Sequence, residues 1–286
     1  MRSLALGLLF LCLNFTASAA AELTGTLKRI DDAGQINLGF RESEPPMSFL
    51  DKNGNPVGYS IDLCDHIAAA VKQKLGRSEI AVNYVPVTAE NRFAAIESGK
   101  IDILCGATTK TLSRSERVGF TQLTFVTGAS LLSLADTKVT NVAGLKGKRV
   151  AVVENTTTIE ALKGALSAML VDTEVVPVPS AAEGMAMLDK GEVDAFSSDQ
   201  VVLIGQVIAR DSGKKYYLSE ELFSFEPFAL ALKRGDADFQ LVADRALSQL
   251  NRNGQILKIY RKWFARFAKE PTIALKALYQ LNATPE

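Results

Sequence analysis

The chain contains Val85-Pro-Val-Thr-Ala-Glu-Asn-Arg-Phe-Ala-Ala-Ile-Glu-Ser-Gly-Lys-Ile-Asp102 and repeats its outline, one residue longer, as Val176-Pro-Val-Pro-Ser-Ala-Ala-Glu-Gly-Met-Ala-Met-Leu-Asp-Lys-Gly-Glu-Val-Asp194. In each copy an apolar run leads into a segment of helical period, which ends at a glycine, Gly99 or Gly191, suited to a left-handed C-terminal cap. A buried-strand pattern follows each glycine. We therefore expect two similar α/β lobes, with a ligand crevice where strand ends and helix N-termini meet between them.

Further strands and helices alternate around the two copies. The expected strands are Ile36–Phe40, Ile80–Val85, Ile101–Cys105, Arg149–Val153 and Val193–Phe196, and the expected helices begin at Gly58, at a capping box formed by Thr157-Thr-Ile-Glu160, and at Asp236, the last one running to Phe267. Extended segments at 125–132 and 223–232 separate the two halves. The chain is thus predicted to leave lobe 1, build lobe 2 and return, which gives two hinge crossings. Lobe 1 comprises 22–127 and 225–286, and lobe 2 comprises 128–224.

The first 21 residues resemble a cleavable secretory signal. Arg2 precedes an apolar run from Leu4 to Leu13, and small residues in Ala-x-Ala spacing follow up to Ala21. That run is too short to span a bilayer, and no later segment offers the roughly 20 apolar residues that a membrane helix needs. We expect a soluble exported protein, and Cys12 is not expected to carry a lipid because large residues precede it.

Composition excludes several classes of function. Lys+Arg and Asp+Glu number 32 each, so no basic excess would attract nucleic acid or anionic lipid. The single histidine, His66, allows no His-based catalytic triad and no His metal cluster. Gly144-Leu-Lys-Gly-Lys-Arg149 has two residues between its glycines where a phosphate loop has four, so a nucleotide site is also excluded. We expect no cofactor and no metal.

Two cysteines, Cys64 and Cys105, remain after signal removal. An oxidising compartment would allow a disulfide between them. Both also lie on apolar faces of their predicted elements, where free thiols pack well. We expect buried free thiols, with the disulfide as the alternative.

Polar side chains gather at the ends of the predicted elements. They are Arg41, Arg92, Arg114, Thr156 to Thr158 and Asp199. Each taken singly could be a helix cap or part of a solvated surface pair, such as Arg41 with Glu42 and Glu44. Taken together they fall where residues line a cleft between lobes. Guanidinium groups and helix N-termini bind carboxylates, while an aspartate with strand-end carbonyls binds an ammonium, so the set is the complement of an amino acid.

Linked motifs along nearly the whole mature chain resemble one known family, the bacterial extracellular solute-binding proteins, family 3. The motifs are Gly58-Tyr-Ser-Ile-Asp62, Asn91-Arg92, Gly99-x-x-Asp102-x-x-Cys105-Gly-x-Thr-Thr109, Arg114, Phe120, Phe125-Val-x-Gly128, Leu145-Lys-Gly-Lys148 and Lys262-Trp-Phe264. The resemblance implies a type II periplasmic binding fold that closes on an amino acid and delivers it to the permease of an ABC importer. We expect a periplasmic monomer.

The resemblance is greatest to the family's binders of acidic amino acids and implies a role for each site residue. Arg114 would hold the ligand's α-carboxylate with Thr109 and the Thr156 region. Asp199 and the carbonyl of Ala107 would hold the α-ammonium. Arg41 and Arg92 would take a side-chain carboxylate.

The sequence departs from those binders at four positions. Ala89 and Ala107 stand where they carry serine, Ala181 where they carry histidine, and Met47 near where they carry an aromatic residue. Each change removes a polar partner or a bulky wall, while the arginines still demand a negative group. We expect an acidic amino acid, with a related dicarboxylate or a larger amino acid as the second choice.

Two other functions are compatible with this scaffold. The first is a periplasmic dehydratase of the prephenate or arogenate type, which would also hold carboxylates with arginines. Such an enzyme needs a general acid in the cleft, and the only obvious carboxylate there is Asp199. The second is a sensory binding module, disfavoured because no enzymatic or membrane segment follows Trp263. We expect no catalytic activity.

Overall fold

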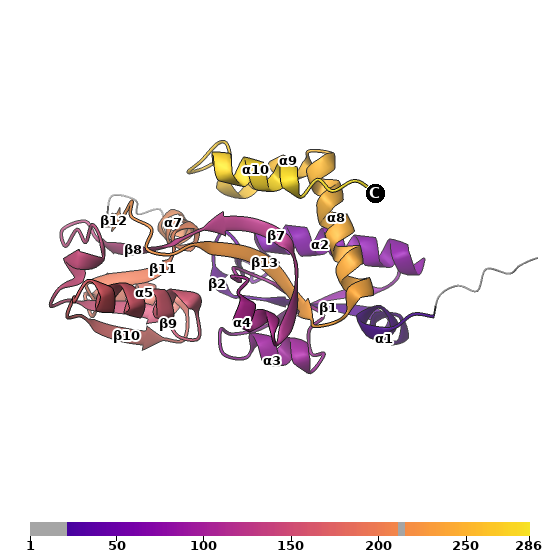
Figure 1. The fold of residues 1–286 in the computed structure, drawn as a ribbon, viewed down its shortest axis with the longest axis horizontal. Coiled ribbons are helices and arrows are strands. Elements are labelled where there is room, and N and C mark those ends of the chain that lie inside the picture. The colour runs from indigo at the N-terminus through magenta and orange to yellow at the C-terminus, as the bar shows by residue number, and fades with distance from the viewer. Residues whose placement is uncertain (1–21, 211–214) are drawn as a thin grey trace, which may run out of the picture.

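The computed structural model describes residues 22–210 and 215–286, so the signal expected at 1–21 lies outside the described residues. Two five-stranded sheets stand side by side, each with helices packed against it (Figure 1). The strands of the first sheet are, in spatial order, β5 (Ala81–Pro86), β1 (Gln35–Phe40), β6 (Ile103–Cys105), β13 (Glu226–Lys233) and β7 (Val118–Thr127). Those of the second sheet are β10 (Glu174–Val178), β9 (Arg149–Val153), β11 (Ala195–Asp199), β8 (Ala129–Leu134) and β12 (Tyr216–Leu218). The expected α/β class is confirmed.

The two repeat copies occupy equivalent places in the two sheets. The first copy supplies the end of β5 and helix α3 (Arg92–Glu97) and leads into β6. The second supplies the end of β10 and helix α6 (Ala181–Lys190) and leads into β11. In both sheets the second strand of the order, β1 or β9, pairs in parallel with the strands on either side. Gly99 and Gly191 have φ values of 72° and 71°, which confirms the left-handed glycine predicted after each helix.

The chain passes between the two sheets at two adjacent points. Strand β7 ends at Thr127 and β8 starts at Ala129, while β13 begins at Glu226 and pairs with β7 in antiparallel register, Glu226 opposite Thr127. Both crossing strands run from one half of the molecule towards the other in Figure 1. Gly128 allows this close approach, because a Cβ there would lie 2.4 Å from the Ser224 carbonyl oxygen.

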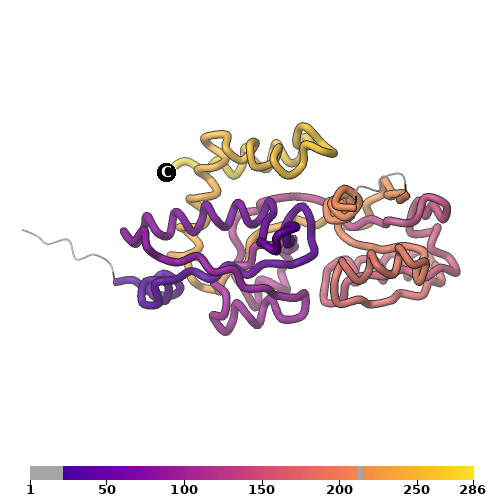
Figure 2. The backbone as a smooth tube through the Cα atoms, turned by 180° about the vertical axis from the view of Figure 1, so that it is seen from behind, coloured from indigo at the N-terminus to yellow at the C-terminus, as the bar shows by residue number. Residues whose placement is uncertain are grey.

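Helices α2 (Tyr59–Leu75), α8 (Ala237–Arg252) and α9 (Gln255–Phe264) cover one face of the first sheet, and α3 covers the other. An aromatic cluster holds α2 and α9 to the sheet, with Phe264 ring centroids 5.1 Å from Phe125 and 5.3 Å from Tyr59. The second sheet lies between α6 and α7 (Gln200–Ala209) on one face and α5 (Thr157–Ala168) with the 3-10 turn η1 (Val142–Leu145) on the other. Figure 2 shows the C-terminal end of the chain on the half that holds the first sheet.

Some elements differ from the sequence-based expectation. The helix expected over 236–267 is two helices, α8 and α9, separated at Gly254, whose φ of 72° ends the first one. The cap of α5 is Thr156 and not Thr157, because the Thr156 Oγ1 accepts the hydrogen bond from the Ile159 N–H. The unexpected elements include α1 (Gly25–Ala33), α4 (Leu112–Ser115), α10 (Ile273–Leu281), β12, and a small sheet of β2 (Ser43–Glu44), β3 (Ser48–Leu50) and β4 (Pro56–Val57).

A disulfide joins Cys64 to Cys105, so the expectation of buried free thiols was wrong. Helix α2 packs against strand β6 and brings the two Cα atoms to 6.2 Å, which is within the range that a disulfide spans. Both cysteines are fully buried, as expected. None of the helices in the described ranges is both long and apolar enough to cross a membrane.

Candidate ligand-binding cleft

One cavity of about 30 Å³ lies between the two sheets, and all seven residues predicted for the site line it. They are Arg41, Arg92, Ala107, Thr109, Arg114, Thr156 and Asp199. The structure adds further lining residues that the sequence did not single out as a site: Glu44, Val153, Ser197, Ser198 and Val202. The ends of β1, β6, β9 and β11 therefore meet here, as open α/β sheets predict.

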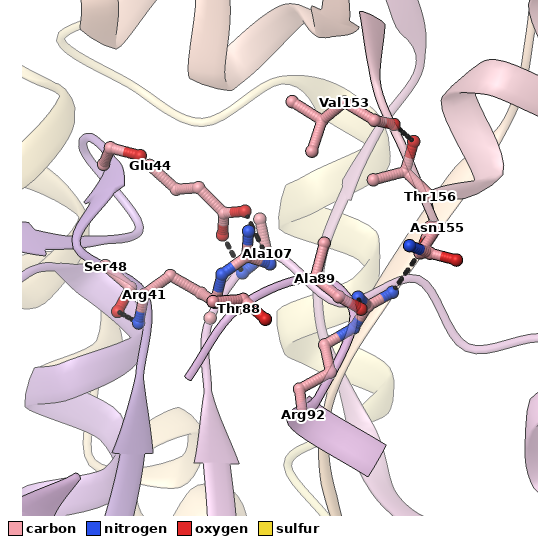
Figure 3. A network of polar contacts seen from close by, with 12 residues as sticks. Arg41, Glu44, Ser48, Thr88, Ala89, Arg92, Ala107, Val153, Asn155 and Thr156 are labelled. Carbon is pink, nitrogen blue, oxygen red and sulfur yellow. Dashed lines mark hydrogen bonds and ion pairs between the residues drawn. The ribbon is translucent and has the colours of Figure 1, made fainter. Parts of the chain in front are cut away.

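Arg41 follows β1 and is buried against Glu44 on β2. Their side chains form an ion pair with 2.9 Å between Arg41 Nη1 and Glu44 Oε1, and the second Glu44 oxygen accepts from the Ala107 N–H at 3.4 Å. Figure 3 shows the Glu44 carboxylate turned towards Arg41 and Ala107. In the sequence analysis Glu44 was considered only as a possible member of a solvated cluster with Arg41, whereas both side chains lie in the cavity wall. The available signal was an acidic residue three positions after the arginine.

Arg92 is the first residue of α3, and only 3% of it is exposed. Its guanidinium donates to the Ala89 carbonyl and, at 2.8 Å, to the Asn155 carbonyl on the second-sheet side of the cavity (Figure 3). It also lies 4.6 Å from the centroid of the Phe93 ring. Burial, followed by the nearby Arg114 and Arg41, lowers the pKa of Arg92 to about 9. In the described part of the chain no carboxylate forms an ion pair with Arg92, so it is a buried cation with carbonyl partners.

Arg114, at the end region of α4, reaches back to the strand-end segment before it. Its Nη1 donates to the Thr109 carbonyl at 2.8 Å, and its backbone N–H donates to Thr111 Oγ1 at 3.1 Å. Burial lowers the pKa of Arg114, while the charges of Glu226 and Asp199 act to raise it. The Arg114 guanidinium is thus fixed by a backbone carbonyl and surrounded by carboxylates that it does not directly pair with.

Glu226 lies beside the cavity with 2% exposure and connects its two sides. Its Oε2 accepts from Thr109 Oγ1 at 2.5 Å on the first-sheet side and from Thr157 Oγ1 at 2.7 Å on the second-sheet side. Ser224 Oγ donates to the other oxygen at 2.6 Å. In the sequence analysis Glu226 was only part of the extended segment 223–232 that was expected to separate the two halves. Three hydroxyl donors satisfy its charge, so this carboxylate is a fixed part of the site.

Asp199 is the last residue of β11, and its Oδ1 is buried without a hydrogen-bond partner in the described chain. It does not cap the helix that follows with its side chain. Burial first, then the charges of Glu226 and Glu44, raises the pKa of Asp199 well above the ordinary value of a carboxyl. An unpaired buried carboxylate oxygen is costly and calls for a cation or a donor from a ligand.

The N-terminus of α5 closes the second-sheet side of the cavity. Thr156 Oγ1 donates to the Val153 carbonyl at 2.6 Å and caps the helix (Figure 3). Helix N-termini carry a partial positive charge and free N–H groups, which favour an anion. This end therefore lies across the cavity from the arginines of the first-sheet side.

The four residues at which the sequence departs from binders of acidic amino acids do not all line the cavity. Ala107 and Ala181 line the cavity, whereas Ala89 contributes its carbonyl to Arg92. Met47 is fully buried in the core around the first sheet. Among residues 22–210 and 215–286, no group of three or more His, Cys, Asp or Glu side chains is arranged to hold a metal ion.

Comparison with known proteins gives a consistent result. The L-glutamate/L-aspartate-binding protein of Pseudomonas aeruginosa is 34% identical over 248 residues, which cover 86% of this chain and 82% of that protein. The glutamate/aspartate import solute-binding protein of Escherichia coli is 29% identical, with 86% and 82% covered. An ancestral arginine-binding protein bound to arginine superposes with a TM-score of 0.72 at 28% identity, covering 81% of this chain and 98% of that one. Residues 36–266 match the model of one family, and the chain belongs to it: the bacterial extracellular solute-binding proteins, family 3.

Proposed function

We propose that this protein is the periplasmic substrate-binding component of an ABC amino-acid importer and that its ligand is an acidic amino acid. The observation that carries the proposal is the opposition of charges in one buried cavity. Within residues 22–210 and 215–286, Asp199 Oδ1 has no hydrogen-bond partner, while the Arg92 guanidinium donates to backbone carbonyls and pairs with no carboxylate. An α-amino acid with a second carboxylate supplies the missing groups of both signs.

The roles follow from the positions of the side chains. Arg114 and Thr109, with the N-terminus of α5, would receive the α-carboxylate. Asp199 and the Ala107 carbonyl would receive the α-ammonium. Arg92, with Arg41 beside it, would receive the side-chain carboxylate. Relatives that are named for glutamate and aspartate binding support this choice of ligand.

The proposal includes a hinge motion. Lobe 1 would comprise 22–127 and 225–286, and lobe 2 would comprise 128–224, with β7–β8 and the start of β13 as the two crossings. Residues of both sheets line the cavity, so the lobes would open to admit the ligand and close around it. We propose that residues 1–21 direct export and that the mature protein acts as a monomer and delivers its ligand to a membrane permease.

The comparisons do not favour the dehydratase and sensory interpretations. The relatives reported above are named as binding or import proteins. The dehydratase interpretation can be tested separately, because it requires turnover of prephenate or arogenate with release of water and carbon dioxide.

A thermal-shift screen of amino acids and dicarboxylates tests the proposal. Glutamate or aspartate at about 100 times its dissociation constant should add about 2.7 kcal/mol to the free energy of unfolding and raise the melting temperature by about 5 to 10 °C. Mass spectrometry should recover the ligand unchanged. The proposal fails if neither acidic amino acid shifts the melting temperature, and the binding function fails with it if prephenate or arogenate is converted.

A further inference from the structure

Glu44 brings a carboxylate to the arginine-rich end of the cavity. Its side chain is only 13% exposed, and its ion-pair partner, the Arg41 side chain, is 8% exposed. By contrast Glu42, which directly precedes β2, is exposed to solvent. The pair of Glu44 and Arg41 is therefore part of the cavity wall and not a surface ion pair.

This pair limits what a ligand's side chain can contact. A buried ion pair is costly to break when one partner would be left uncompensated. Arg41 is consequently held by Glu44, and Arg92 is the cavity-lining arginine at this end that has no carboxylate partner in the described chain. Glu44 lies close enough to Arg92 for its charge to offset part of the fall in the Arg92 pKa. A ligand carboxylate bound by Arg92 would thus also meet repulsion from Glu44.

Glu44 keeps free capacity to accept hydrogen bonds. A carboxylate has about four acceptor positions. Two of them are engaged, by Arg41 at 2.9 Å and by the Ala107 N–H at 3.4 Å. The cavity wall therefore offers both a donor, Arg92, and an acceptor, Glu44. A carboxamide presents the matching acceptor and donor on one carbon, whereas a carboxylate presents acceptors alone.

We propose that Glu44 is a specificity-determining residue that extends the ligand range from acidic amino acids to their side-chain amides. The amide oxygen accepts from Arg92 while the amide nitrogen donates to Glu44. This inference rests on the proposed function, because it assumes that an amino acid occupies the cavity with its side chain towards Arg41 and Arg92.

The test compares the dissociation constants of L-glutamate and L-glutamine for the mature protein by isothermal titration. Glu44→Gln keeps the size of the side chain and removes its charge. This substitution should raise the ratio of the dissociation constant for glutamine to that for glutamate by about tenfold or more. The side-chain carboxylate of glutamate is no longer repelled by residue 44, and the side-chain amide of glutamine loses its charged acceptor. Glu42→Gln, the exposed neighbour, should leave that ratio within about twofold of the wild type.

The outcomes distinguish failure of the proposed role of Glu44 from failure of the proposed function. A Glu44→Gln ratio within twofold of the wild-type ratio overturns the role of Glu44 but leaves the proposed function intact. A wild-type protein that binds neither glutamate nor glutamine overturns the proposed function and this inference together. If circular dichroism shows that Glu44→Gln does not fold, Glu44→Ser is measured in its place with the same expected direction.

Discussion

The Arg92 guanidinium donates a hydrogen bond to the Asn155 carbonyl at 2.8 Å and so connects the first-sheet side of the cleft to the second-sheet side. Asn155 follows β9 directly before the cap of α5 and has a φ of 57°, an uncommon conformation for a residue other than glycine. One side chain thus contributes both a positive charge to the cavity and a contact that depends on the separation of the two sides. Removing the Arg92 side chain should weaken ligand binding through the loss of both the charge and the contact.

Arg92→Ala is expected to weaken glutamate binding by about 2 to 5 kcal/mol, since a desolvated carboxylate would lose its charge partner. Glutamine, whose amide carries no charge, should be affected less. Isothermal titration with both ligands measures the difference. Arg117→Ala is the matched control, because Arg117 lies 5.8 Å from the same Phe93 ring but pairs with Glu97 on the surface. Equal losses for the two ligands would contradict the side-chain role of Arg92.

Arg114→Ala should abolish binding of every amino acid, because the group assigned to it is the α-carboxylate that all of them carry. The expected cost is again about 2 to 5 kcal/mol. Titration with glutamate, aspartate and glutamine measures it, and Lys110→Ala, a nearby exposed cation, should change none of the three affinities. An Arg114→Ala protein that still binds one of these ligands within a factor of two of wild type would remove Arg114 from the site.

The sequence predicted those features that depend on local signals. Left-handed glycines and buried apolar runs are local, so the repeat located the parallel strands and the helices between them. Residues at strand ends and helix N-termini could be assigned to one cleft for the same reason. All seven predicted residues line it.

Features that depend on distant contacts were missed. Glu44 contacts Ala107 across 63 positions, and Glu226 contacts Thr109 across 117, so neither orientation leaves a local pattern. The state of the two cysteines was predicted wrongly for a similar reason. Both a thiol and a disulfide suit an apolar face, and only the packing of α2 on β6 brings the sulfur atoms together.

Asp199→Asn should stabilise the ligand-free protein at neutral pH while removing amino-acid binding. Since burial raises the folded-state pKa of Asp199, the folded protein binds more protons than the unfolded chain between the two pKa values. The contribution of Asp199 to the free energy of unfolding is fully present below the pKa of the group in the unfolded chain, about 4. This contribution is lost as the pH rises through the pKa of Asp199 in the folded protein. Asparagine has no such dependence, so the variant should gain in melting temperature over wild type as the pH increases.

Melting temperatures of the ligand-free proteins between pH 4 and pH 8 measure this gain. Asp172→Asn provides the control, because Asp172 is exposed and its substitution should leave the wild-type profile unchanged. A wild type that is more stable than Asp199→Asn at neutral pH would show that the Asp199 charge is compensated within the protein. The proposed contact with an α-ammonium would then lose its basis.

The paired substitution of Cys64 and Cys105 by alanine should cost about 4 kcal/mol of unfolding free energy, the loop-closure value for a crosslink over this length of chain. The two cysteines are 41 positions apart in sequence. Urea unfolding measures the loss. A reducing agent should lower the stability of the wild type to a similar extent and leave the alanine variant unchanged. Equal stability of wild type with and without reductant would contradict a stabilising disulfide.

Gly205→Ala tests closure of the cleft. Gly205 lies within α7 on the second-sheet side and meets the loop before β3 on the first-sheet side, where a Cβ would lie 2.0 Å from the Pro45 carbonyl oxygen. Beside it, Gln206 Nε2 donates to the Ser43 carbonyl at 2.7 Å. The Pro45 backbone cannot move aside as a flexible side chain can. A methyl group added at Gly205 should therefore keep the first-sheet and second-sheet sides of the cleft apart. Alanine is the better helix former by about 1 kcal/mol, so α7 itself should persist.

Gly164→Ala is the matched control, because Gly164 also lies inside a helix, α5, and a Cβ there meets nothing within 4 Å. With saturating glutamate, small-angle scattering should show compaction of the wild type and Gly164→Ala but not of Gly205→Ala. Glutamate affinity should fall about tenfold or more in Gly205→Ala alone, since a cleft held open loses the contacts from one side. If Gly205→Ala compacts and binds like the wild type, then the contact between Gly205 and Pro45 yields without cost, and closure of the cleft must be limited by other contacts.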